Sequence, residues 1–289
     1  MQQYFSKSKK DNVLYLHEYD LNHIKNVMRM KENDEIIVVY DKTSYICSLN
    51  RDLASCNIKS VFKSEEEQSE FIVYVPFLVD EKMSYVFKHG TELGVTKFVV
   101  VEYAHCKYKL PKKDYEKKLT RWNKIIKEAA EQSYRITKPE LDSIISPSSI
   151  ECIPGVNIMC SLDKENVKSI CKVLTPKNSH DTINLVFGPE GGLSKIEEDM
   201  LEEKGFIKTS LGSDVLRTET VPLAVASILK YLKEWDKNGK LHPHHTSGNG
   251  YRYYSHEQLN QVMNVKPNLD RSVIGYCRVS SNKQKEDTA

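Results

Sequence analysis

Short runs of β-branched and aromatic residues alternate with polar stretches along the first 75 residues. Four of these runs predict strands, at residues 35–40, 45–49, 56–62 and 71–75. One helix interrupts them, because apolar residues recur at helical spacing from Leu21 to Met28, and Asp20 precedes them as an N-cap residue. The pattern predicts a small, mostly β module with one helix, followed by a loop or linker at residues 64–69.

From residue 76 the pattern changes to helices that alternate with strands. Nearly continuous apolar runs predict four strands buried on both faces, at residues 97–103, 156–162, 183–187 and 207–211. Apolar residues at helical spacing predict helices over residues 79–93, from about residue 114 and from about residue 220. This alternation is typical of an α/β fold with a largely parallel sheet.

Length and composition exclude several classes of protein. A chain of 289 residues suggests about two domains, and 39% hydrophobic residues are enough to form ordinary cores. The longest apolar run has nine residues, whereas a membrane-spanning helix needs about 20, and the first residues lack the apolar segment of a secretory signal. The seven cysteines form no CxxC pair. We therefore expect a soluble cytosolic protein without a metal site or a disulfide framework.

The charge is balanced overall but not along the chain. The net charge is +2, from 42 basic and 40 acidic residues, yet residues 107–127 hold nine basic residues and two acidic ones. Such a local excess suits a polyanion such as a nucleic acid. A lysine-rich helix face exposed to water gives the same pattern.

A glycine-rich turn joins a predicted strand to a helix at residues 185–194, LVFGPEGGLS. Ser194 and Glu197 have the spacing of a capping box, which predicts that a helix begins there. Three glycines let the backbone approach a ligand closely, so main-chain N–H and C=O groups can contact its polar edges. A tight strand–helix turn without a ligand has the same pattern, and the segment is neither a Walker loop nor GxGxxG.

A second turn follows at residues 210–220, SLGSDVLRTET, and also joins a strand to a helix. Thr220 is a candidate N-cap, and Arg217 and Glu219 lie near the same helix end. An arginine is unfavourable at the N-terminal end of a helix dipole unless it serves a partner. Since neighbouring parallel strands end at one edge of a sheet, we expect the two turns to form one ligand crevice.

These two motifs, in this order, closely resemble those of the RsmE-type methyltransferases, which modify a uridine ring nitrogen in bacterial 16S ribosomal RNA and belong to the SPOUT class. Three further segments agree: Glu92-Leu-Gly94 before a buried strand, EAAEQS at residues 128–133 with Arg135, and HIKNVMR at residues 23–29. The resemblance covers about residues 1–232. It implies a PUA-like β-barrel at residues 1–70, which helps to hold RNA, and an α/β domain at residues 76–232.

The resemblance implies that the α/β domain is a trefoil-knotted parallel sheet, works as a homodimer and binds S-adenosylmethionine. The implied cofactor-binding residues lie in the two turns: Phe187, Gly188, Pro189, Glu190, Gly191, Gly192, Leu211, Gly212, Leu216 and Arg217. Arg217 and Glu219 are the implied catalytic residues. Arg217 would stabilise the negative charge that spreads over the base carbonyls, and Glu219 or a water molecule would take the ring proton. Helix capping is the alternative role for Glu219.

Four residues are predicted to contact RNA: Arg29, Arg121, Gln132 and Arg135. A surface salt bridge is the alternative for Arg29, and a polar helix end is the alternative for Gln132 and Arg135. Four positions depart from the family pattern: His89, Tyr134, Asp214 and Val221. They lie near the expected site, so the sequence also leaves open an RNA-binding protein that transfers methyl groups poorly.

From residue 233 the chain resembles a different family. Residues 233–263 are similar to the latter part of a MerR-like helix-turn-helix module, and residues 273–287 to the opening of a serine recombinase domain. On that match Ser280 is the nucleophilic serine and Arg278 its companion, without the further arginines that the chemistry needs. We expect a partly disordered fused fragment without recombinase activity. A DNA-binding fragment carried on a methyltransferase body is the alternative function, although the first helix of the DNA-binding module is missing.

Overall fold

The computed structural model describes residues 1–64, 69–151, 153–162, 167–175, 181–237, 245–246 and 252–253. The chain divides into two compact units, Met1–Lys237 and Asn238–Ala289. In the second unit, β13 (His245–Thr246) pairs with β14 (Arg252–Tyr253) in antiparallel fashion. The two residues matched to a recombinase, Arg278 and Ser280, lie outside the described residues.

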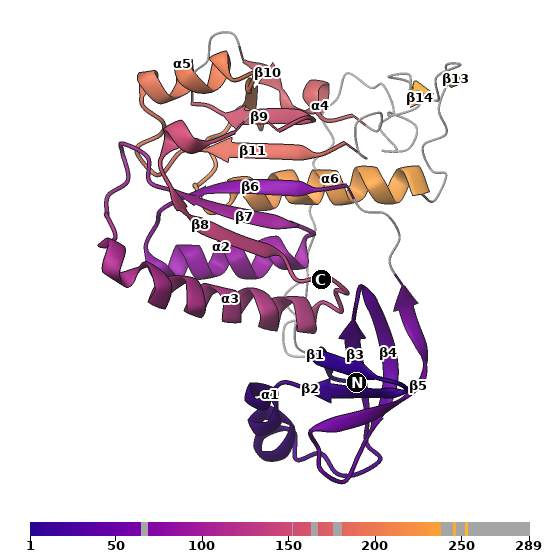
Figure 1. Cartoon of the computed structure of the whole chain (residues 1–289). Coiled ribbons are helices and arrows are strands. Elements are labelled where there is room, and N and C mark those ends of the chain that lie inside the picture. The colour runs from indigo at the N-terminus through magenta and orange to yellow at the C-terminus, as the bar shows by residue number, and fades with distance from the viewer. Residues whose placement is uncertain are drawn as a thin grey trace, which may run out of the picture. The chain divides into compact units, whose positions relative to one another are not determined.

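Five strands at the start of the first unit form a closed barrel in the order β1-β2-β5-β4-β3 (Figure 1). They are β1 (Gln3–Lys10), β2 (Val13–Leu16), β3 (Glu35–Tyr40), β4 (Thr43–Leu49) and β5 (Ser55–Ser64). Parallel pairing of β1 with β3 closes the barrel. The sequence pattern missed β1 and β2, because only the first half of β1 is buried and its second half, Lys7–Lys10, carries exposed polar residues.

The helix of the barrel region differs from the prediction. α1 (Glu18–Asn22) begins after His17 and continues into one turn of π-helix, His23–Val27. Asp20 is not the N-cap residue; it lies inside α1 and is buried, where its Oδ1 accepts a hydrogen bond of 2.6 Å from Lys127 Nζ. Val27 and Met28, predicted on the buried face, are exposed.

Seven parallel strands form the sheet of the α/β part, in the order β10-β12-β9-β11-β6-β7-β8. Their bounds are β6 (Phe71–Pro76), β7 (Lys97–Val101), β8 (Glu140–Ile145), β9 (Val156–Cys160), β10 (Lys168–Ser169), β11 (Ile183–Phe187) and β12 (Ile207–Ser210). The parallel α/β class is therefore confirmed. The strand at residues 71–76, grouped above with the β module, belongs to this sheet.

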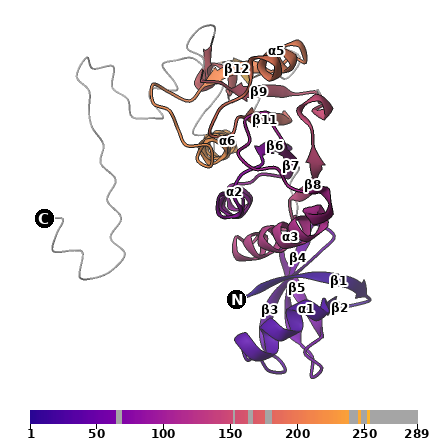
Figure 2. The same cartoon turned by 90° about the vertical axis from the view of Figure 1, so that its left-hand side faces the viewer.

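Helices cover both faces of the sheet (Figures 1 and 2). The helices are α2 (Asp80–Glu92), α3 (Tyr115–Gln132), α4 (Ile170–Val173), α5 (Lys195–Glu203) and α6 (Val221–Lys237). Side chains of α2, α3, α4 and α6 pack with one set of alternating strand residues, such as Val73, Val100 and Leu185. The other set, such as Tyr74 and Val186, packs with Leu201 of α5 and with Phe206.

A buried ionic cluster fastens the barrel to α3. Lys127 Nζ lies 2.6 Å from the Asp20 carboxylate of the barrel and 2.7 Å from Glu131 one turn further along α3. The ammonium group also lies 4.6 Å from the ring centre of Tyr19. Two carboxylates thus share one lysine in a site where all three side chains are at most 14% exposed.

This cluster predicts a pH-dependent stability. Burial raises the pKa of the Glu131 carboxyl from 4.5 to about 7, and repulsion by Asp20 adds to the rise while Lys127 opposes it. Between these values the folded protein binds more protons than the unfolded chain, so its free energy of unfolding falls as pH rises from about 5 to 8. We expect this loss to be on the order of 2 kcal/mol in the wild type and absent in Glu131→Gln. Urea unfolding at several pH values measures the free energy of unfolding. If it changes with pH in the same way in both proteins, Glu131 is not the source of the pH dependence.

Candidate active site

A crevice of about 750 Å³ opens at the carboxyl ends of β9, β11 and β12. Its volume is that of a small-molecule site, and its position is the usual one for a ligand in an open α/β sheet. The two predicted turns form most of its lining. All eleven predicted cofactor-binding and catalytic residues line it: Phe187, Gly188, Pro189, Glu190, Gly191, Gly192, Leu211, Gly212, Leu216, Arg217 and Glu219.

The first loop of the crevice, residues 188–193, folds tightly back on itself. A Cβ atom at Gly188 would lie 2.7 Å from the carbonyl carbon of Gly192 and 2.7 Å from the Leu193 nitrogen, so only glycine fits there. Gly192 adopts φ +74°, in the left-handed region. The predicted capping box is confirmed, since Ser194 and Glu197 exchange hydrogen bonds at the start of α5.

The Glu197 side chain also connects this loop to the segment that follows β7. Its Oε1 accepts a 2.8 Å hydrogen bond from the Ala104 backbone N–H, and Glu197 is buried. His105 Nδ1 lies 3.2 Å from the Gly192 carbonyl oxygen. The first loop is therefore held by its own turn, by α5 and by residues 104–105.

The second loop, residues 211–219, places a cationic and an anionic side chain beside the first loop. Arg217 is exposed, and within the described ranges its guanidinium has no ion pair or side-chain hydrogen bond. Glu219 is mostly buried, at 14% exposure, and its Oε2 lies 3.2 Å from Lys82 Nζ. The backbone N–H of Thr220 donates to the Arg217 carbonyl, which shapes the entry into α6.

The sequence analysis missed one charged residue of the crevice, Lys82 in the first turn of α2. Its Nζ donates a 2.7 Å hydrogen bond to Glu190 Oε1 in the first loop and also contacts Glu219 in the second. The signal available in the sequence was the one used for Arg217, a basic residue at the unfavourable end of a helix dipole.

A cysteine also lines the crevice, at the end of β9. Burial raises the pKa of the Cys160 thiol to about 12, so the thiol stays protonated near neutral pH. A protonated thiol is a poor nucleophile. The crevice therefore favours chemistry by positioning and charge over covalent catalysis by this cysteine.

Comparison with known families assigns the two parts of the first unit. Residues 65–230 match the model of an RNA methyltransferase domain, and residues 20–59 match that of an RNA methyltransferase PUA domain. Ribosomal RNA small subunit methyltransferase E of Bacillus subtilis is 31% identical over 253 residues, which cover 81% of this chain and 98% of that protein. The chain belongs to the RsmE-type RNA methyltransferase family. The same enzyme of Aquifex aeolicus is 32% identical over 79% of this chain and 99% of its own.

Solved structures of the family have the same fold. The Neisseria gonorrhoeae methyltransferase E, crystallised with bound S-adenosylmethionine, has a TM-score of 0.71 at 25% identity and covers 80% of this chain and 98% of its own. A Legionella pneumophila protein described as a putative methyltransferase also has a TM-score of 0.71, at 24% identity over 79% of this chain and 96% of its own. The predicted combination of a PUA-like barrel with a SPOUT-type domain is confirmed.

The chain also carries a segment from outside this family. Residues 230–271 match the model of MerR HTH family regulatory proteins, in agreement with the helix-turn-helix resemblance noted in the sequence. Most of this segment lies outside the described residues. The match to a serine recombinase stays a prediction.

Of the four residues predicted to contact RNA, Arg135 forms hydrogen bonds inside the protein. Its Nη1 donates to the backbone carbonyls of Thr91 and Val95, at 2.8 Å and 2.6 Å, which fastens the turn between α2 and β7. Burial lowers the pKa of its guanidinium to about 10. Nη1 of Arg135 thus serves contacts inside the protein, and its RNA role stays a prediction.

The other three stay predictions. Arg29 and Gln132 are exposed, whereas Arg121 lies 3.0 Å from Asp80 although its side chain is 57% exposed. The basic segment 107–127 also divides into two groups. Lys118 pairs with Asp80 and Lys127 with the buried cluster, while five lysines are exposed and form no ion pair within the described part of the chain: Lys107, Lys109, Lys112, Lys113 and Lys117.

Two of the four departures from the family pattern line the crevice, Asp214 and Val221. His89 lies outside that lining and bonds to Glu92 on its own helix, with Nδ1 2.9 Å from Oε2. Tyr134 has φ +54° and its hydroxyl donates to the Met1 carbonyl, at the junction with the barrel. Asp214 is therefore the departure that changes the charge of the crevice.

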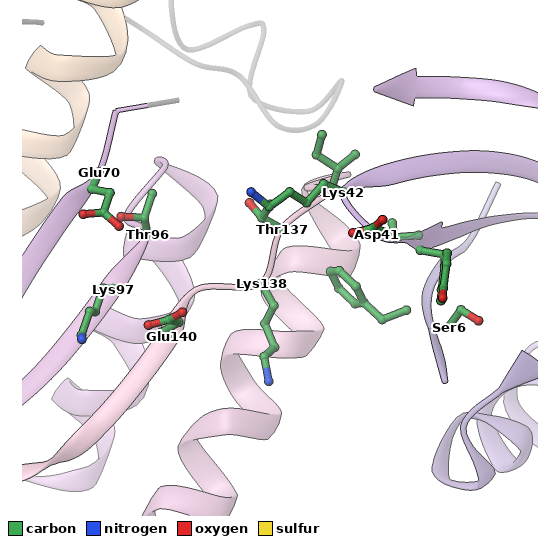
Figure 3. Close-up of a pocket in the computed structure, with 13 residues that line it drawn as sticks. Ser6, Asp41, Lys42, Glu70, Thr96, Lys97, Thr137, Lys138 and Glu140 are labelled. Atoms are coloured by element: carbon green, nitrogen blue, oxygen red, sulfur yellow. The ribbon is translucent and has the colours of Figure 1, made fainter. Parts of the chain in front are cut away.

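A second cavity, of about 800 Å³, lies between the barrel and the opposite edge of the sheet (Figure 3). Its walls are the β3–β4 turn with Asp41 and Lys42, and residues next to the strand starts such as Glu70, Thr96 and Glu140. These are the amino ends of parallel strands, whereas ligands of such sheets bind at the carboxyl ends. Neither a metal site nor a membrane span is found in the part of the chain that the structure describes. No three or more His, Cys, Asp or Glu side chains gather there in a way that could hold a metal ion. The described helices are all too short or too polar to cross a membrane.

The packing of the first loop predicts the effect of one added methyl group. Gly188→Ala forces its Cβ against Gly192 and Leu193, so we expect a loss of about 1–3 kcal/mol in the free energy of unfolding. Thermal or urea unfolding measures the loss. Ser213→Ala, at an exposed position of the second loop, is the control and should change stability by less than about 0.5 kcal/mol. Equal free energies of unfolding for the two variants would show that the loop has room for a Cβ atom at Gly188.

Proposed function

We propose that this protein transfers a methyl group from S-adenosylmethionine to the N3 ring nitrogen of a uridine in 16S ribosomal RNA of the small subunit. The observation that carries the proposal is the crevice formed by both family loops at the carboxyl edge of the sheet. The names of the Bacillus and Aquifex relatives and the cofactor bound in the Neisseria structure support it. A ribosomal RNA substrate also implies a cytoplasmic location.

The residues of the crevice fit S-adenosylmethionine. Gly188, Gly191 and Gly192 carry no side chains, so the backbone of the first loop can approach a ligand closely, and the crevice has room for a molecule of this size. Residues 188–192 of the first loop and Leu211, Gly212 and Leu216 of the second would hold the cofactor. When bound, the cofactor supplies an electrophilic methyl group on a sulfonium. Main-chain groups of both loops can fix its polar edges in one orientation.

The side chains at the mouth of the crevice act on the acceptor base. The ring nitrogen of uridine must lose its proton, and negative charge then spreads onto the base carbonyls. Arg217, whose guanidinium is exposed and unpaired among the described residues, would stabilise that charge. Glu219 is the candidate proton acceptor, with a water molecule as the alternative. Its Oε2 lies 3.2 Å from Lys82 Nζ, at the point where the two loops meet.

The partners follow from the family and from the surface charge. We propose that the barrel and the exposed lysines at residues 107–117 hold the RNA, and that the protein works as a homodimer, as the SPOUT resemblance implies. The weakly active alternative rests on Asp214, which puts a further carboxylate in the crevice. The following experiment distinguishes the two.

Methyl transfer from labelled S-adenosylmethionine to small subunits that lack the modification tests the function. We expect label at a single uridine of 16S RNA with the full chain and with a chain shortened after Lys237, the end of α6. Arg217→Ala should lower kcat about 100-fold, because one stabilising donor is lost, with a much smaller change in cofactor affinity. Cofactor binding by calorimetry without any transfer by either chain would support the RNA-binding alternative.

The salt dependence of RNA binding tests the exposed lysines. Each lysine that neutralises a phosphate adds roughly 0.7–0.9 to the slope of log affinity against log salt. The double substitution of Lys112 and Lys113 to Gln should therefore reduce that slope by about 1.5. Lys195→Gln is the control, because this lysine on α5 pairs with Asp199. An unchanged slope for the double variant would remove residues 112–113 from the RNA surface.

A further inference from the structure

Lys82 connects three elements that are far apart in the sequence. It is the third residue of α2, and its Nζ lies 2.7 Å from Glu190 Oε1 and 3.2 Å from Glu219 Oε2. Glu190 belongs to the first loop of the crevice and Glu219 to the second. The ammonium group is therefore a direct bridge between the two loops, and Lys82 itself lines the crevice.

These contacts differ from ordinary surface ion pairs, which contribute little. The three side chains are 29%, 32% and 14% exposed, against 71% and 52% for the Lys195–Asp199 pair within α5. The pair with Glu190 spans 108 residues of chain. Its hydrogen bond raises the pKa of Lys82, and it lowers the pKa of Glu190 although burial alone would raise it. Lys82 and Glu190 are therefore both charged near neutral pH.

The same contacts leave Arg217 without an ion pair among the described residues. Six charged side chains line the crevice, and two of them are cations: Lys82, Glu190, Glu198, Asp214, Arg217 and Glu219. Glu190 and Glu219 both pair with Lys82. With Lys82 removed, Arg217 is the remaining cation of this group, and either carboxylate gains by pairing with it. A guanidinium that is already paired with a carboxylate stabilises negative charge on a substrate less well.

We propose that Lys82 is a positioning residue that ties the two loops of the crevice together and keeps Glu190 and Glu219 away from Arg217. The part that concerns Arg217 rests on the proposed function. The tie between the loops is a property of the free protein, so it can be measured without cofactor or RNA.

Hydrogen exchange of the free full-length protein tests the tie. Lys82→Met keeps the length of the side chain and removes its charge, and Lys82→Arg keeps the charge. In Lys82→Met we expect amide exchange at least about 10-fold faster in peptides from both loops, residues 188–193 and 211–219, with barrel peptides unchanged. Lys82→Arg should stay close to the wild type. Lys88→Met, an exposed lysine on the same helix, is the matched control. Unchanged exchange of both loops in Lys82→Met overturns the proposal.

Cofactor affinity and turnover test how Lys82 acts. Lys82→Met should raise the Kd for S-adenosylmethionine about 10-fold and lower kcat, and Lys82→Arg should restore most of both. Because Lys82 acts through the loops, the loss of affinity in Lys82→Met should accompany the faster exchange of both loops, and Lys82→Arg should reverse both effects together. A raised Kd in Lys82→Met with unchanged exchange of the loops would mean that Lys82 contacts the ligand itself, which contradicts a positioning role. If the wild type binds no cofactor, the proposed function fails, while the exchange experiment still decides whether Lys82 ties the loops.

Discussion

Parallel hydrogen bonding of β9 to both β11 and β12 is the constraint on which the candidate site depends. Cys160 of β9 is in register with Phe187 of β11 on one side and with Thr209 of β12 on the other. The three strands therefore end at nearly the same level, and the chain leaves β11 and β12 in the same direction. The two loops meet beside each other although about 20 residues separate them, and Lys82 reaches both from α2.

Local sequence signals were enough to predict the features that depend on neighbouring residues. The buried strands, the capping box of Ser194 and Glu197, and the α/β class all follow from periodicity and short spacings. The placing of both loops in one crevice followed from a rule of parallel sheets rather than from the residues themselves. The identity of the ligand came from family resemblance, since a glycine-rich turn alone fits many polar ligands.

Residues whose partners lie far away in the chain could not be assigned in this way. Asp20 has the sequence context of an N-cap, but the buried ammonium of Lys127, 107 residues away, decides its place inside the helix. Arg135 follows a helix end, and nothing in its local sequence indicates its hydrogen bonds to the backbone carbonyls of Thr91 and Val95. β1 was missed because its outer half turns polar residues to water and leaves no apolar run. For Asp20 and Arg135, a contact with a distant part of the chain decides where the side chain lies.

The two cavities of the first unit lie at opposite ends of the sheet strands. The crevice is at the carboxyl ends, and the barrel packs near the amino ends, where Figure 3 shows Lys42 and Thr137 among the side chains that line the second cavity. A strand of five residues such as β11 is about 16 Å long. A single RNA molecule that contacts the barrel and also presents a base to the crevice must be at least as long as this distance. On the proposed function, this distance sets a minimum size for the substrate, which a free nucleoside does not reach and a folded ribosomal RNA does.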